Sequence, residues 1–136
     1  MWGTLQHPRH VEFYEEFHAN RQSGEEDWMP MVKAVRHLQS LAVAPSLYAF
    51  TSLWRFHATT APAYLECDGH CSVTIVWRYS DRRFHLALDR LDEGWLEDRT
   101  PECICAEEEF PLAITPFIER LLASKAPFPP GPSQKK

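Results

Sequence analysis

Hydrophobic and polar residues alternate most regularly between residues 72 and 90. The apolar positions lie on both sides of a polar turn, Ser80-Asp81-Arg82-Arg83, and comprise Val73, Ile75, Trp77, Tyr79, Phe84, Leu86 and Leu88. Because successive side chains of a strand point to opposite faces, this pattern predicts a β-hairpin whose apolar residues share one face. A loop of two or four residues would place Tyr79 opposite Phe84. The opposite face is mostly polar, as expected for an antiparallel sheet with one solvated side, and carries Thr74, Val76, Arg78, His85, Ala87 and Asp89.

Three other segments have apolar residues at helical spacing, and we expect helices over residues 7–22, 28–43 and 116–125. The middle segment shows the clearest stripe, which consists of Trp28, Met31, Val32, Val35, Leu38, Leu41 and Ala42. In the last segment, Thr115 is the expected N-cap, and Pro116 would then occupy the first helical position, where its missing N–H costs little.

The remaining apolar segments predict further strands. Residues 47–57 alternate and are rich in aromatic side chains, residues 63–67 are short and precede a turn, and residues 102–107 would form a last strand. The whole pattern predicts one α+β domain over residues 1–125, with two N-terminal helices, an antiparallel β-meander of four or five strands, and a C-terminal helix packed on one sheet face. Residues 126–136, APFPPGPSQKK, are expected to form a disordered proline-rich tail.

Composition narrows the class of protein. The chain has 136 residues and a formal net charge of −5, whereas nucleic-acid-binding domains usually carry a basic surface. No apolar run approaches the roughly 20 residues of a membrane span, and the first residues lack the basic and apolar regions of a signal peptide. We therefore expect a cytoplasmic protein with reduced thiols that binds neither nucleic acid nor membrane.

The negative charge is concentrated in residues 89–109. This stretch holds nine acidic residues against Arg90 and Arg99, namely Asp89, Asp92, Glu93, Glu97, Asp98, Glu102, Glu107, Glu108 and Glu109. Segregated charge favours docking onto a surface of opposite sign. The sequence therefore predicts a protein-binding module that contacts its partner through this acidic flank and the sheet edge, with Asp92, Glu93, Glu97, Asp98, Glu107, Glu108 and Glu109 as the contact residues.

The alternative prediction is a small-molecule-binding or metal-binding protein. His57, Arg78, His85 and Asp89 would lie on the polar sheet face, and a histidine beside a carboxylate can act in acid–base catalysis. No nucleophile elbow, glycine-rich phosphate loop or H-E-x-x-H pattern accompanies these residues. We therefore predict no catalytic residues and no cofactor, and we favour an interaction protein over an enzyme.

Four cysteines could supply the metal site of that alternative. Cys67 and Cys71 form a C-x₃-C pair, and Cys103 and Cys105 form a C-x-C pair, neither of which is a usual zinc spacing. A two-residue turn at Asp68-Gly69 would separate the first pair, whereas a three-residue loop would place Cys67 opposite Cys71. The second geometry gives better burial, and we interpret the thiols as small core residues and predict no metal.

Two aromatic or proline-rich features are candidates for a binding surface. If the helices leave part of the sheet uncovered, the aromatic residues of 47–57 would form an exposed apolar patch. In the tail, Pro127-Phe128-Pro129-Pro130 satisfies P-x-x-P, a pattern that docks in aromatic grooves, although no Arg or Lys is correctly placed beside it.

Overall fold

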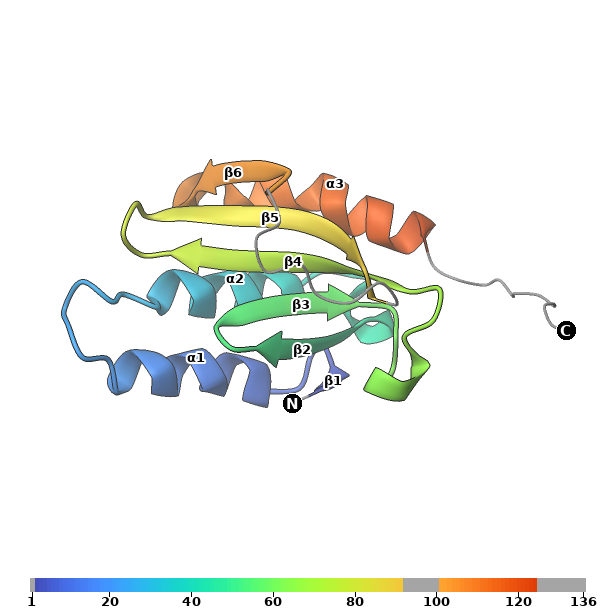
Figure 1. Ribbon diagram of the computed structural model, residues 1–136, viewed down its shortest axis with the longest axis horizontal. Coiled ribbons are helices and arrows are strands. Elements are labelled where there is room, and N and C mark those ends of the chain that lie inside the picture. Colours follow the sequence, from blue (N-terminus) through green and yellow to red (C-terminus); the bar gives the residue numbers. More distant parts are fainter. Residues whose placement is uncertain (1, 92–100, 125–136) are drawn as a thin grey trace, which may run out of the picture.

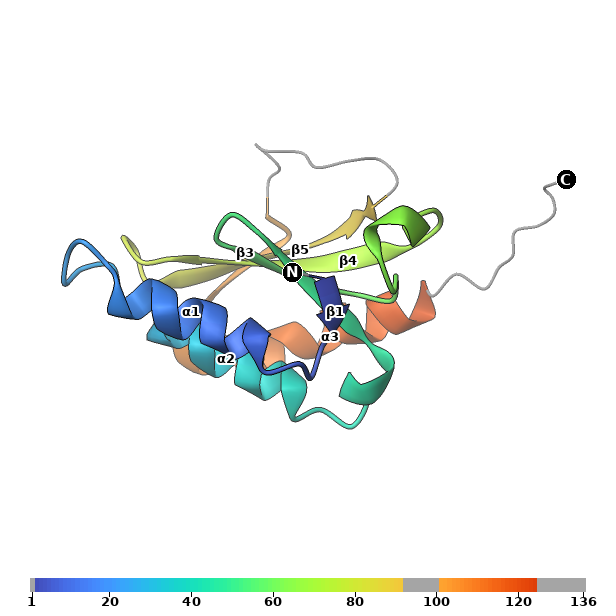
Figure 2. The same cartoon turned by 90° about the horizontal axis from the view of Figure 1, so that it is seen from below.

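The computed structural model describes residues 2–91 and 101–124, which form a two-layer α+β domain (Figures 1 and 2). One layer is an antiparallel sheet of six strands, and the other consists of three helices on one face of that sheet. The strands are β1 (Trp2–Thr4), β2 (Tyr48–Ser52), β3 (Arg55–Thr59), β4 (Cys71–Arg78), β5 (Arg83–Arg90) and β6 (Cys103–Ala106). The helices are α1 (Arg9–Ala19), α2 (Met29–Gln39) and α3 (Phe110–Ala123), and the short 3₁₀ turns are η1 (Ala44–Ser46), η2 (Tyr64–Glu66) and η4 (Glu107–Glu109).

The sheet confirms the predicted fold class. Its spatial order follows the chain, from β1 to β6, and every neighbouring pair is antiparallel. β1 precedes α1 and α2 in the sequence, yet it pairs with β2, which follows them. The sequence did not predict this strand, because three residues are too few to show a period of two. The observed sheet therefore has one strand more than the upper predicted number.

The central hairpin of β4 and β5 has the predicted faces but a different register. Trp77 pairs with Phe84 and Ile75 with Leu86, so each residue of β4 lies opposite a partner two positions earlier than expected. The turn comprises residues 79–82, and it is closed by the Arg82 N–H donating to the Arg78 carbonyl at 2.8 Å. Arg82 has φ 55°, a left-handed conformation that a non-glycine sequence does not signal. Because the shift is two residues, no side chain changes face.

The predicted apolar face of this hairpin forms the centre of the core. Its fully buried members are Val73, Ile75, Trp77, Phe84 and Leu86, whereas Leu88 is partly buried and Tyr79 is exposed at the turn. The helices cover these residues from one side, and α2 and α3 contribute Met31, Val35, Leu38, Ile114, Phe117 and Leu121. Burial of this apolar surface, at about 25 cal/mol per Å², is the main stabilising contribution to the fold.

Two predicted strands are wrong. Residues 47–57 form the hairpin of β2 and β3 instead of one strand, because Leu53 adopts φ 59° and reverses the chain before Trp54. Leucine and tryptophan are not usual turn residues, so the sequence carried no turn signal here. Residues 63–67 contain the 3₁₀ turn η2, and β4 pairs with β3 instead of with this segment.

The helices occupy the predicted regions with altered ends. α1 and α2 are shorter than expected, and Asp27 supports the start of α2 by accepting the Met29 N–H on Oδ1 at 3.1 Å. α3 begins at Phe110, six residues before the predicted start, so Thr115 is not its N-cap and Pro116 lies inside the helix. The predicted last strand, residues 102–107, is confirmed as β6.

Two sequence predictions concern residues that lie outside the described ranges. The proline-rich tail, residues 126–136, lies outside the described residues, as do the acidic residues Asp92, Glu93, Glu97 and Asp98. Within the described ranges, none of the helices combines the length and apolar character that a membrane span requires.

Candidate functional site

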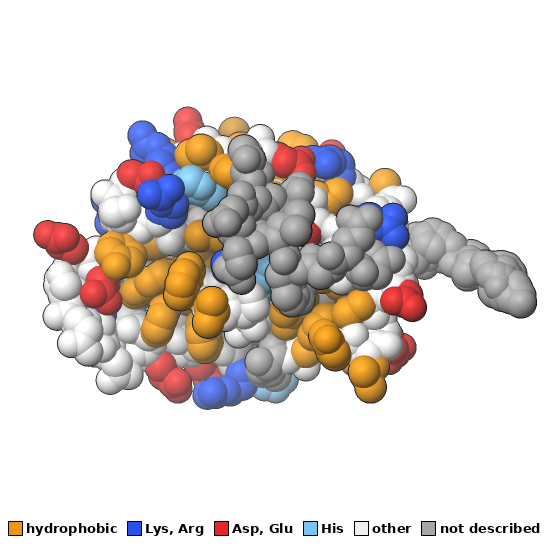
Figure 3. All heavy atoms as spheres, in the orientation of Figure 1, with side chains coloured by type: hydrophobic (Ala, Val, Ile, Leu, Met, Phe, Trp, Pro, Cys, Tyr) orange, Lys and Arg blue, Asp and Glu red, His pale blue; other side chains and the backbone are white. Residues whose placement is uncertain are grey.

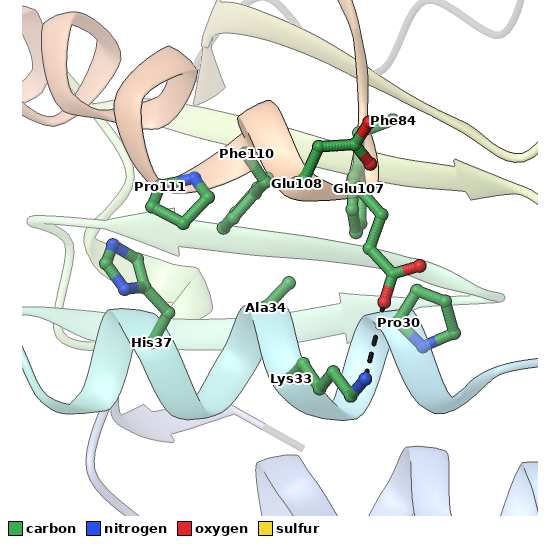
Figure 4. A pocket seen from close by; sticks show the side chains of 9 residues that line it. All are labelled: Pro30, Lys33, Ala34, His37, Phe84, Glu107, Glu108, Phe110 and Pro111. Atoms are coloured by element: carbon green, nitrogen blue, oxygen red, sulfur yellow. Dashed lines mark ion pairs between the residues drawn. The ribbon is translucent and has the colours of Figure 1, made fainter.

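A groove between α2 and the start of α3 brings together two of the predicted contact residues. It has a volume of about 300 Å³ and is lined by Pro30, Lys33, Ala34, His37, Phe84, Glu107, Glu108, Phe110 and Pro111. Figure 4 shows the α2 residues on one side and Phe110 and Pro111 on the other. Ala34 contributes a small, buried side chain to this lining.

The mouth of the groove is charged. Glu107 forms ion pairs with Lys33 at 3.6 Å and with Arg82 at 3.5 Å, and in Figure 4 its carboxylate points toward Lys33. Glu108 has no hydrogen-bond or ion-pair partner within residues 2–91 and 101–124. Glu109 has a local structural role, because its Oε1 accepts the Ala106 N–H at 2.7 Å before α3. The predicted acidic contact set is therefore divided, and Glu108 is its most available described member.

His37 forms one end of the groove. Its ring lies edge-on to Phe110, with ring centroids 6.1 Å apart. The Nε2 atom is buried and has no hydrogen-bond partner in the described part of the chain. Such a nitrogen is costly to leave unsatisfied, so a ligand group that hydrogen-bonds to it would gain affinity. The groove thus offers an apolar floor, a carboxylate at its mouth and one unsatisfied ring nitrogen.

An aromatic cleft lies at the end of the sheet where the β2–β3 and β4–β5 turns meet the C-terminal end of α1. It has a volume of about 420 Å³ and is lined by Phe17, Glu26, Trp28, Trp54, Val76, Trp77, Arg78, Tyr79 and Ser80. Figure 3 shows hydrophobic side chains gathered in this region of the helix-free face. Trp54 is 43% exposed and Tyr79 and Phe17 are each 37% exposed, so part of the aromatic surface from residues 47–57 does not enter the core.

The helix-free face also carries a row of stacked rings. Trp2 stacks on Phe50 with centroids 4.0 Å apart, and Phe50 stacks on His57 with centroids 4.4 Å apart. These residues occupy adjacent positions on β1, β2 and β3. Phe50 belongs to a second small apolar cluster with Ala61 and Leu91, which lies apart from the main core. The helix-free face of the sheet is therefore partly apolar over β1, β2 and β3.

A hydrogen-bonded chain continues from His57 across the sheet. The Ser52 hydroxyl lies 3.2 Å from His57 Nε2, His57 Nδ1 lies 3.1 Å from Thr74 Oγ1, and Thr74 donates to Asp89 Oδ2 at 2.7 Å. Because an ionised Asp89 can only accept, the Thr74 hydroxyl must receive the Nδ1–H of His57. His57 Nε2 is then the acceptor for the Ser52 hydroxyl, so the direction of every donor in the chain follows from Asp89.

This order of groups resembles a nucleophile, base and acid, but its acid–base properties differ. Burial and, to a smaller extent, the nearby charge of Arg55 lower the pKa of His57 to about 3. An imidazole with that pKa is a weak proton acceptor at neutral pH. Thr74 separates it from the carboxylate that would stabilise the imidazolium. The chain satisfies the polar groups of a histidine that is only 2% exposed, which explains its presence as a structural element.

The other proposed members of the polar-face site do not join this chain. His85 pairs with Val76 rather than Arg78, and Arg78 lines the aromatic cleft. With Tyr79 opposite Phe84, as the sequence predicts, Arg78 would face His85; this pairing is wrong, because the two-residue register shift places Arg78 opposite Arg83. His57 and Asp89 are brought together, with Thr74 between them.

The cysteines separate into two regions. Cys67 packs against the small cluster on the helix-free face, and its thiol lies 2.8 Å from the Tyr64 carbonyl. Cys71, Cys103 and Cys105 pack on or in the main core. None of the four cysteines, all of which lie in the described ranges, forms a disulfide, and burial raises the pKa of Cys105 to about 11, which keeps its thiol protonated. In residues 2–91 and 101–124, no group of three or more His, Cys, Asp or Glu side chains is placed to hold a metal ion.

The groove was missed in the sequence because its two walls come from separate segments. Residues 30–37 and 107–111 meet only through the packing of α2 against α3, and Phe84 joins them from β5.

No family model matches the chain, and neither a curated protein nor a solved structure matches it.

Proposed function

We propose that this protein is a protein-binding module that holds a partner segment in the groove between α2 and α3. The segment would place an apolar side chain on the floor formed by Ala34, Phe84 and Phe110, and a Lys or Arg at Glu108. The observation that carries the proposal is this combination of an apolar groove with an available carboxylate at its mouth. Interfaces commonly pair an apolar centre with a polar rim.

Charge at the mouth determines the expected sign of the partner. The carboxylate of Glu107 is already paired with Lys33 of α2 and with Arg82, whereas in Figure 4 the carboxylate of Glu108 points away from Lys33. A cationic group from a partner would therefore be attracted to Glu108 and repelled by Lys33. This arrangement favours a basic over an acidic partner segment, in agreement with the acidic flank predicted from the sequence.

The size of the groove determines what part of a partner enters it. A space of about 300 Å³ is at the lower end for ligand pockets and accommodates one or two side chains. The remaining contacts would come from the surrounding rim, which is exposed at Lys33, Glu108 and Pro111. A short extended or helical segment meets this requirement.

An array of immobilised short peptides, in which one apolar and one charged position vary, tests the proposal with the full chain. We expect selection of peptides that combine a large apolar residue with Lys or Arg. For a selected peptide, Glu108→Gln should weaken binding about fivefold, as expected for a rim charge worth about 1 kcal/mol. Lys33→Ala should strengthen binding, because it removes a repelling charge.

Glu119→Gln is the matched control. Glu119 is exposed on α3 and has no partner in the described residues, but it lies outside the groove. Its substitution should leave the dissociation constant unchanged. Selection without preference for basic residues, or equal effects of Glu108→Gln and Glu119→Gln, would contradict the proposal.

A further inference from the structure

The aromatic cleft presents a solvent-exposed hydrogen-bond donor beside its rings. The indole N–H of Trp54 has no hydrogen-bond partner in residues 2–91 and 101–124, although its backbone carbonyl accepts the Tyr14 hydroxyl at 2.9 Å. The backbone of Trp54 is thus anchored to α1, while its ring projects at the β2–β3 turn and remains 43% exposed. The cleft therefore combines a fixed aromatic surface with an available N–H group.

The other rings are arranged at an angle to one another. Trp28 lies against Tyr79 with ring centroids 5.6 Å apart and an interplanar angle of 66°, and it also contacts Phe17 at 4.8 Å. Inclined rings of this kind leave ridges and hollows instead of a flat surface. Glu26, Arg78 and Ser80 supply polar groups at the margin.

These features match the chemistry of a proline-rich segment. A polyproline II helix makes no internal hydrogen bonds, so its carbonyl groups remain available to an indole donor. Its rigid rings pack into aromatic-lined grooves and lose little conformational entropy on binding. An exposed tryptophan with a free N–H beside inclined aromatic rings is the arrangement that such a ligand requires.

The chain itself contains a segment of this kind. Pro127-Phe128-Pro129-Pro130-Gly131-Pro132 follows shortly after α3 and forms a P-x-x-P pattern. α3 has 14 residues and carries the chain about 21 Å away from the end of the sheet where the cleft lies (Figure 1). Pro127 and Pro132 are four and nine residues beyond Ala123, so a fully extended chain reaches only about 14 Å at the start of the segment and about 30 Å at its end.

That reach is too short for the same molecule. To lie in the cleft, the whole segment would have to return along the length of α3 and also reach across the sheet to the β2–β3 turn, and its first residues cannot do so (Figure 1). We propose that the proline-rich segment 127–132 binds the aromatic cleft of a second copy of the chain, with the Trp54 ring and indole N–H as its main contacts. This contact uses a surface separate from the α2–α3 groove.

A synthetic peptide of residues 125–136, titrated into the full chain, provides the direct test. Binding should change the tryptophan fluorescence and saturate, and Trp54→Ala should weaken the affinity about tenfold or more, as for a central aromatic contact. Trp54→Phe should give an intermediate loss, because it keeps a ring and removes the N–H donor. Leu65→Ser is the control, since Leu65 is 91% exposed but does not line the cleft.

Self-association of the full chain provides the second readout. Analytical ultracentrifugation should show a concentration-dependent increase in mass that is lost in Trp54→Ala and in a Pro127→Ser, Pro129→Ser, Pro130→Ser variant. A full chain that stays monomeric at millimolar concentration, or a serine-substituted peptide that binds as tightly as the natural one, would overturn the proposal. Binding of unrelated proline-rich peptides but not of residues 125–136 would overturn the assignment of the occupant.

Discussion

Arg82 connects three parts of the molecule at the β4–β5 turn. Its guanidinium pairs with Asp27 before α2 and with Glu107 before α3, and it lies 5.3 Å from the centroid of the Trp77 ring. Its positive φ costs backbone energy, of order 1 kcal/mol for a non-glycine residue. The side chain offsets part of that cost by joining the loop before α2 to the mouth of the groove, which explains why an arginine can occupy a position that favours glycine.

His57 should make folding stability depend on pH. Its folded-state pKa of about 3 lies below the ordinary value of 6.5, so between these values the unfolded chain binds a proton that the folded protein does not. The contribution is complete above pH 6.5 and is lost as the pH falls, by about 1.4 kcal/mol for each pH unit. Urea unfolding between pH 7 and pH 4 measures this slope.

His57→Gln separates this residue from the other histidines. Burial also lowers the pKa values of His10, His70 and His85, so these groups contribute in the same direction. Glutamine can still hydrogen-bond to its neighbours but does not titrate, and the slope should therefore become shallower. Equal slopes for the two proteins would show that His57 is not the main acid-sensitive group.

Single residues also mark where sequence reasoning reached its limit. Alternation assigned both faces of the central hairpin correctly, because burial imposes a period of two. The register and the β2–β3 turn depended on Arg82 and Leu53, which adopt positive φ without being Gly, Asn or Asp. Because neither position carries a residue type that favours positive φ, local propensity could not predict these conformations.

Helix α3 contains an internal proline that limits its stability. Pro116 is the seventh residue of the helix, where it cannot donate to the Leu112 carbonyl. An interior proline costs about 3 kcal/mol, of which roughly 1 kcal/mol is offset by its restriction of the unfolded chain. Because Pro116 is exposed, Pro116→Ala should raise the free energy of unfolding by about 1–2 kcal/mol in urea titrations.

Pro111 provides the comparison within the same helix. It lies in the first turn, where a proline lacks no intrahelical hydrogen bond, so Pro111→Ala should give no comparable gain. Similar stabilisation by both substitutions would contradict this explanation. The two prolines also obscured the start of α3, since Pro116 in the sequence suits a first turn as well as Pro111 does.

Across the whole molecule, stability should decrease from the centre of the sheet to its edges. β4 is paired along its length with β5 and lies over the core, whereas β1 has three residues and β6 has four, each at an edge. Amide hydrogen exchange should therefore be slowest in β4 and β5 and fastest in β1 and β6. Protection of β1 equal to that of β4 would contradict this order.

The fold class could be predicted at this scale, but the candidate site could not. Hydrophobic spacing determined that helices and strands segregate into two layers. The groove is formed where residues of α2, β5, η4 and α3 meet, and the cleft is formed where two turns meet near the end of α1. The spacing of residues along one segment predicts neither the groove nor the cleft. The clustering of acidic residues therefore identified Glu108 but not the apolar residues around it.

The position of β1 has a consequence for how the chain folds. β2 and β3 are joined by residues 53–54, β3 and β4 by residues 60–70, and β4 and β5 by residues 79–82, so these pairings close loops of at most 11 residues. β1 reaches β2 only across α1 and α2. Its pairing must therefore close a much longer loop, which places the N-terminal edge among the last contacts formed and leaves β2 briefly as an open edge during folding.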